Sequence, residues 1–156
     1  MEIQTIHQFV HVVRGQKVLL DSDLAQLYGV ETKALNLAVK RNIERFPEDF
    51  MFTLTETEWK NLRLQNETSS YGGRRYLPNV FTEQGIAMLS GVLKSERAVQ
   101  VNIAIMRMFV ELRRYSFDYT ELSSRMDELE GKVEDVHHVI LEIMRPDVRE
   151  VRRIGY

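Results

Sequence analysis

The sequence predicts an α+β domain that is mainly helical, contains a helix-turn-helix and a small β-hairpin or wing, and is followed by a coiled-coil-like C-terminal helix. Apolar residues recur at helical spacing over much of the chain, and β-branched residues concentrate in a few short stretches. From Leu122 onward the apolar spacing becomes a regular heptad. A length of 156 residues with 44% hydrophobic residues suits one domain with an appendage.

The N-terminal part predicts a β-hairpin followed directly by a helix. In "FVHVVRGQKVLL", residues 9–20, two apolar, β-branched runs flank the turn at Arg14-Gly15-Gln16. In the next stretch, Asp21 or Ser22 is expected to be the N-cap of a helix that ends at Gly29.

The remaining elements are predicted from their start and stop signals. Pro78 makes the segment that contains it either an edge strand or an irregular one. The glycine-rich "NETSSYGGRR", residues 66–75, is the strongest loop signal in the chain. The other predicted elements are a helix from about Thr32 to Arg45 ended by Pro47, a strand in residues 49–55, a helix opened by the Thr55 and Glu58 capping box and running through Leu64, a helix capped by Thr82, and a longer helix capped by Ser95 and running to Arg114.

Composition and charge limit the classes of function. The chain has no cysteine, no apolar run long enough to span a membrane and no export signal at its start, which predicts a cytoplasmic protein. Residues 1–115 carry 15 Lys and Arg against 13 Asp and Glu, whereas residues 116–156 carry 6 against 10. The net charge of −2 therefore comes from the C-terminal part and does not exclude nucleic-acid binding by the rest.

The break at Gly29 is typical of a helix-turn-helix. Ala25 is small enough for a close helix crossing, and Gly29 can adopt the left-handed conformation that the turn needs. Val30 is expected to plug the turn. The residues expected to join the two helices to a core are Leu24, Tyr28, Leu35, Ala38, Val39 and Ile43.

The opposite side of the second helix supplies candidate DNA contacts. Asparagine reads adenine, and lysine or arginine reads guanine or holds phosphate. Because the N-terminal part of such a helix approaches the bases, Thr32, Lys33 and Asn36 are the candidates for base contact. Lys40 and Arg41 are the candidates for backbone contact. An ordinary helical hairpin with a solvated charged face is the alternative.

Two further segments bear on binding. Arg74 and Arg75 lie beside a glycine pair and between two tyrosines, as in a wing that contacts phosphate or the minor groove; a plain surface loop is the alternative. The heptad seam predicts pairing with a second copy of the chain, with Arg125 facing Glu130 of a parallel partner, or a single helix folded back on its own domain. Its members are Leu122, Met126, Leu129, Val133, Val136, Ile140 and Ile143.

The stretches "RGQKVLLDSDLAQLYGVETKALNLAVKRNIERFPEDFMFTLT" and "GGRRYLPNVFTEQGIAMLSGVLKSERAVQVNIAIMRMFVELR", with the closing "RRIGY", resemble the phage "open reading frame six N-terminal" domain family, which is related to KilA-N domains. The resemblance covers roughly residues 8–114. It implies a KilA-N-like DNA-binding domain over residues 1–115, in a regulator or antirepressor of phage or prophage origin. A dimerising heptad helix over residues 116–145 and a short basic tail over residues 146–156 would follow.

No catalytic machinery is expected. His7 and His11 are four residues apart, but their region is interpreted as strand and offers no third metal ligand. His137 and His138 fall at heptad positions expected to be solvated. We therefore expect a DNA-binding transcriptional regulator without enzymatic activity, metal or cofactor, whose partners are double-stranded DNA, a second copy of the chain and a repressor or other regulatory protein. The alternative is an antirepressor that sequesters a repressor without touching DNA.

Overall fold

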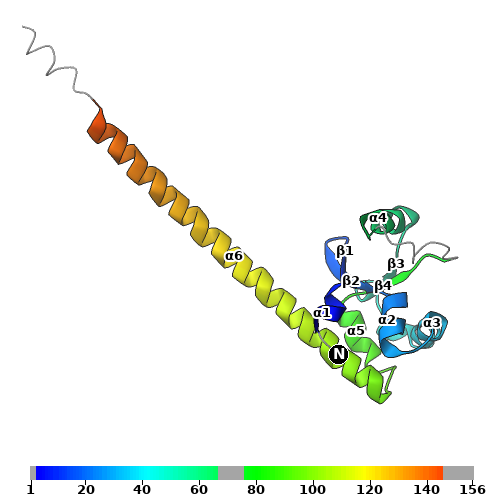
Figure 1. The fold of residues 1–156 in the computed structure, drawn as a ribbon. Coiled ribbons are helices and arrows are strands. Elements are labelled where there is room, and N and C mark those ends of the chain that lie inside the picture. The colour runs from blue at the N-terminus through cyan, green and yellow to red at the C-terminus, as the bar shows by residue number, and fades with distance from the viewer. Residues whose placement is uncertain (1–2, 67–75, 146–156) are drawn as a thin grey trace, which may run out of the picture. The chain divides into compact units, whose positions relative to one another are not determined.

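The computed structural model describes residues 3–66 and 76–145. The chain divides into two compact units, Met1–Glu111 and Leu112–Tyr156, which are described separately. The predicted α+β class is confirmed, because the described residues form helices and one small antiparallel sheet (Figure 1). The helices are α1 (Ile3–His7), α2 (Asp21–Tyr28), α3 (Thr32–Arg41), α4 (Glu56–Asn66), α5 (Glu83–Leu89) and α6 (Glu96–Met144), with a 3-10 turn η1 (Ile43–Arg45).

The predicted hairpin is confirmed and forms one side of a sheet of order β1-β2-β4-β3. Arg14 and Gly15 form its two-residue loop with φ of 53° and 74°, which is the positive-φ geometry that suits a tight hairpin. The strands are β1 (His11–Val13), β2 (Gln16–Leu20), β3 (Met51–Thr53) and β4 (Asn79–Phe81).

The strand after Pro78 is central, so the prediction of an edge or irregular strand was wrong. β4 pairs with β2 through Leu20 and Val80 and with β3 through Phe52 and Val80. Pro78 precedes the strand, where its missing N–H removes no ladder bond, and its carbonyl accepts a hydrogen bond from the Leu54 N–H at 3.0 Å.

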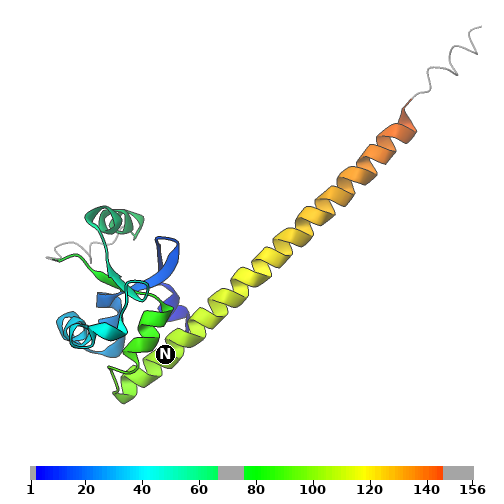
Figure 2. The same ribbon diagram turned by 180° about the vertical axis from the view of Figure 1, so that it is seen from behind.

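Side chains alternate between the two faces of the sheet along each strand, and both faces are buried. Leu20, Val80 and Phe52 share one face, which packs with Trp59 and Leu62 of α4. Leu19 and Phe81 occupy the other face and are fully buried. Figures 1 and 2 show α2 and α3 side by side, with α2 next to β2 and β4. The first part of α6 contributes Ala98, Val101, Ile105, Met108 and Phe109 to the core.

The three predicted side-chain caps that open α4, α5 and α6 are confirmed. Thr55 and Glu58 make the reciprocal capping-box bonds at 2.9 and 3.2 Å. The Thr82 hydroxyl accepts a bond from the Gly85 N–H at 3.4 Å, and the Ser95 hydroxyl accepts one from Ala98 at 3.1 Å.

Several predicted boundaries were wrong. The N-cap of α2 is Leu20, because β2 runs directly into the helix and leaves Asp21 as its first helical residue. Helix α3 ends at Arg41, where the Asn42 amide donates a hydrogen bond to the Ala38 carbonyl at 2.8 Å and the chain continues as η1. The long helix α6 does not end at Arg114 but runs to Met144.

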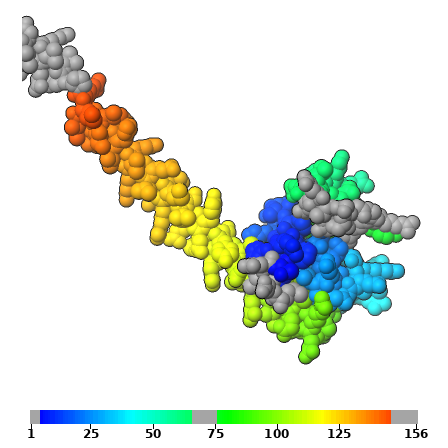
Figure 3. All heavy atoms as spheres, viewed as in Figure 1, coloured from blue at the N-terminus to red at the C-terminus, as the bar shows by residue number. Residues whose placement is uncertain are grey.

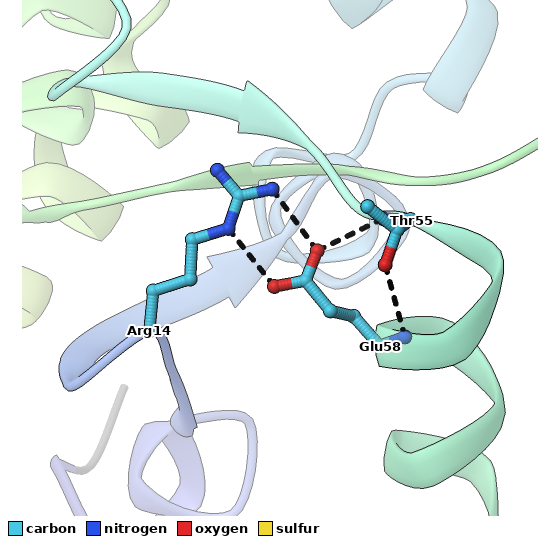
Figure 4. Close-up of polar contacts among 3 residues, drawn as sticks. All are labelled: Arg14, Thr55 and Glu58. Atoms are coloured by element: carbon cyan, nitrogen blue, oxygen red, sulfur yellow. Dashed lines mark hydrogen bonds and ion pairs between the residues drawn. The ribbon is translucent and has the colours of Figure 1, made fainter.

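An ion pair joins the hairpin to the start of α4 (Figure 4). Arg14 donates two hydrogen bonds to the Glu58 carboxylate, at 2.9 and 3.0 Å, and its guanidinium lies 4.2 Å from the centre of the Phe52 ring. Hydrogen bonds from the Arg14 side chain and from the backbone of Thr55 lower the pKa of Glu58 to about 2.

This pair predicts a stability term that depends on pH. Because the folded-state pKa of Glu58 lies below its ordinary value of 4.5, its contribution is complete above about pH 4.5 and is lost as the pH falls toward 2. Since the pair is partly solvated, we expect Glu58→Gln to lower the free energy of unfolding by only about 1 kcal/mol at pH 7, and by less at pH 3. Urea unfolding at both pH values measures this, with exposed Glu56→Gln as control; an equal loss at both pH values would contradict it.

Candidate nucleic-acid interface

The turn between α2 and α3 has the predicted left-handed glycine. Gly29 has φ 72° and ψ 32°, and its N–H donates to the Gln26 carbonyl at 3.2 Å. The Val30 N–H donates to the Ala25 carbonyl at 3.0 Å, which completes a Schellman motif. Ala25 is buried, as its place at the helix crossing requires. The turn is therefore fixed by its own backbone.

A cation from α6 also supports this turn. The sequence did not indicate this contact. Arg97 donates from Nε to the Leu27 carbonyl at 3.0 Å, so it satisfies a carbonyl at the C-terminus of α2. Its side chain lies where a Cβ at Gly29 would approach to 3.1 Å. Sequence spacing gives no signal for this contact, because Leu27 and Arg97 are 70 residues apart.

Three residues expected at the turn or on the inner face are less buried than predicted. Val30 is 38% exposed and does not plug the turn, and Ile43 is 54% exposed. Ile43 leaves the buried stripe because α3 ends at Arg41, so helical spacing no longer applies to it. Ala38 is half-buried. The α3 residues that are buried are Leu35 and Val39.

The outer face of α3 carries the predicted cations. Lys33, Lys40 and Arg41 are exposed, and Thr32 is half-buried at the start of the helix. Within the part of the chain that the structure describes, none of the three cations has an ion-pair partner. Figure 3 shows the segment that contains α3 at the surface of the first unit. This face therefore offers positive charge that no described group neutralises.

Asn36 lies at the edge of that face, and its amide is engaged within the fold. Its side chain is half-buried; Nδ2 donates to Asp21 Oδ2 at 2.9 Å, and Oδ1 accepts a bond from Asn79 Nδ2 at 3.2 Å. Asp21 is 1% exposed and also accepts bonds from the backbone N–H groups of Ser22 and Asn79, at 2.7 and 3.2 Å. The buried carboxylate needs donors, and Asn36 supplies one.

Of the other segments predicted to take part in binding, the structure describes the heptad seam but not the wing or the C-terminal tail. Arg74 and Arg75, and the tail over residues 146–156, lie outside the described residues. The seven seam residues of the second unit are all 46–77% exposed. Arg125, expected to face Glu130 of a partner, pairs with Glu121 of its own helix at 3.1 Å.

A family model for the ORF6N domain matches residues 8–92, more than half of the chain. The chain belongs to this family. The matched residues of the ORF6N domain include β1 to α5, and therefore the α2–turn–α3 unit and the whole sheet. Membership in this phage-associated family supports a phage-related regulatory role. No curated protein and no solved structure matches this chain.

The two N-terminal histidines, His7 and His11, are placed as parts of the fold. His7 ends α1, so the interpretation of its region as strand was wrong there, and His11 begins β1. His11 is buried 3.9 Å from Asp23, and burial lowers its pKa. Over residues 3–66 and 76–145, no group of three or more acidic or histidine side chains is placed to hold a metal ion. None of the helices described above is long and apolar enough to cross a membrane.

Proposed function

We propose that this ORF6N protein is a sequence-specific double-stranded DNA-binding regulator of phage or prophage origin, and that α3 enters the major groove. The exposed face of α3, with Lys33, Lys40 and Arg41 lacking any described ion-pair partner, is the observation that carries the proposal. A helix about 10–12 Å across fits the major groove, and unpaired cations on it can replace the counterions of phosphates.

The direction of α3 divides the roles of its residues. Thr32 and Lys33 lie at its N-terminal end, which in helix-turn-helix proteins meets the base edges. Lys40 and Arg41 lie in its last turn, where they would hold phosphates. Arg74 and Arg75 remain proposed phosphate or minor-groove contacts of a wing. Asn36 would have to exchange its bond to Asp21 before it could read a base.

Lys40→Ala and Arg41→Ala test the phosphate contacts. Each is expected to weaken binding to all duplexes nearly equally and to reduce the slope of log affinity against log salt by about 1. Fluorescence anisotropy with random-sequence duplexes over a range of salt concentrations measures both quantities. Lys60→Ala, an exposed cation of α4, is the matched control.

Two outcomes would overturn this assignment. If the wild-type chain binds no duplex at low salt, DNA binding itself is wrong, and the antirepressor that sequesters a repressor becomes the better proposal. If the wild type binds and Lys60→Ala lowers the slope as much as Lys40→Ala does, α3 is not the element that tracks the backbone.

A second copy of the chain is the proposed partner of the second unit. The exposed seam has the heptad spacing of a parallel pair, and two copies would present two α3 helices to two half-sites. Leu129→Lys puts a charge in the seam and is expected to weaken self-association at least about tenfold. His138→Lys, at an outer heptad position, should leave it unchanged. Sedimentation equilibrium of the full chain measures both, and an unchanged dimer in Leu129→Lys would exclude the seam as the interface.

A further inference from the structure

The centre of the exposed face of α3 is apolar. Leu37 is 45% exposed, and Ala34, one turn before it, is also exposed. Leu37 is four residues from Lys33 and from Arg41 and three from Lys40, so all three cations lie around it on the same face. The core takes Leu35 and Val39 from this helix instead.

The amide of Asn36, which sequence spacing put on this face, lies at its edge and is engaged within the fold. Because Asn36 is bonded to Asp21 and Asn79, the face has no amide at its centre. A helix that lays this face into the major groove brings an apolar side chain, flanked by cations, against the base edges. Among the groups that bases present in that groove, the C5-methyl group of thymine is the apolar one.

We propose that Leu37 reads a thymine methyl group in the bound site, and that the small side chain of Ala34 lets the helix approach the bases closely. The inference rests on the proposed function, because it assumes that α3 lies in the groove. Charge favours DNA over a protein as the occupant of this face. The cations around Leu37 suit phosphates on both sides of a groove, and no acidic residue of α3 accompanies them.

Deoxyuridine provides the test, because it pairs as thymidine does and lacks only the methyl group. A duplex selected from a random library by the full wild-type chain would be resynthesised with each thymine replaced in turn. At one or two positions, uracil is expected to weaken binding by the wild type by about fourfold, the effect of one lost methyl contact. At those positions Leu37→Ala should bind the thymine and uracil duplexes equally.

Two controls separate this contact from general effects. Leu37→Ala removes no charge, so its salt slope should equal that of the wild type. Leu64→Ala removes a leucine of α4 that is 67% exposed and should keep the sensitivity to uracil. Circular dichroism would verify that both variants are folded.

The outcomes distinguish this inference from the function on which it rests. Failure of the wild type to bind any duplex would remove the proposed function. Binding that is indifferent to uracil at every position, a selected site without a fixed thymine, or a Leu37→Ala variant that stays sensitive to uracil would each overturn the reading of thymine while DNA binding stands. A loss confined to association with another protein would assign Leu37 to a protein contact and also overturn it.

Discussion

Gly85→Ala is expected to destabilise the ORF6N domain severely. A Cβ at this position would lie closer than 3.0 Å to the carbonyl oxygen of Phe50 and 3.0 Å from its carbon. The carbonyl oxygen is held in place, because it accepts hydrogen bonds from the Thr82 N–H at 3.0 Å and from the Thr82 hydroxyl at 3.2 Å. Since Thr82 is also the N-cap of α5, neither the helix nor the carbonyl can withdraw without losing these bonds.

We expect Gly85→Ala to lower the free energy of unfolding by about 3 kcal/mol, at the upper end for overpacking. For a unit of this size, that corresponds to a fall of about 10 °C or more in Tm. Thermal unfolding followed by circular dichroism measures it.

Gly131→Ala is the matched control for the same substitution. A Cβ at Gly131 meets no atom within 4 Å, so alanine there is expected to favour the helix by about 0.5–1 kcal/mol. If Gly85→Ala melts at the wild-type temperature, the close approach of α5 to Phe50 is not present in solution.

Local signals predicted much of this fold. Helix caps and turn glycines act within a few residues, so their spacing in the sequence predicts where a helix begins or ends. The examples are the Thr82 cap, the capping box of Thr55 and Glu58, and Gly29. Gly85 shows the limit of such signals. Sequence spacing does not reveal that its Cα faces a carbonyl 35 residues away.

The side of α3 that faces the core could be predicted from spacing, but the positions of residues at the edge of its outer face could not. The buried Leu35 and Val39 fix which side of α3 faces the core, and Lys33, Lys40 and Arg41 are exposed on the other side as expected. Residues on the flanks of a helix are decided by their tertiary neighbours, which spacing does not show. For Asn36 that neighbour is Asp21, which engages its amide, whereas Leu37 stays exposed among the three cations.

Asp21→Ala is the second change for which we expect a large effect. Its buried carboxylate accepts bonds from the Ser22 N–H, the Asn36 side chain and the Asn79 N–H, so it joins α2, α3 and β4 at one point. Alanine would leave these donors without the carboxylate, and a buried donor without a partner costs about 1–3 kcal/mol. We expect a loss of about 3 kcal/mol in urea unfolding, a smaller loss for Asp21→Asn, and little change for Asp49→Ala, an exposed aspartate of the same unit.

A double-mutant cycle between Asp21 and Asn36 then decides what Asn36 does. If their bond supports the fold, Asn36→Ala lowers the free energy of unfolding by about 1–2 kcal/mol. The sum of the losses in the two single variants then exceeds the loss in the double variant by about 1 kcal/mol. The selectivity of Asn36→Ala among duplexes, measured at one salt concentration for both proteins, should then equal that of the wild type. The opposite pair of results, wild-type stability together with about 1–3 kcal/mol less discrimination between sites, would mean that the amide leaves Asp21 and reads a base. In that case Asn36, rather than Leu37, would be the central reading residue of α3.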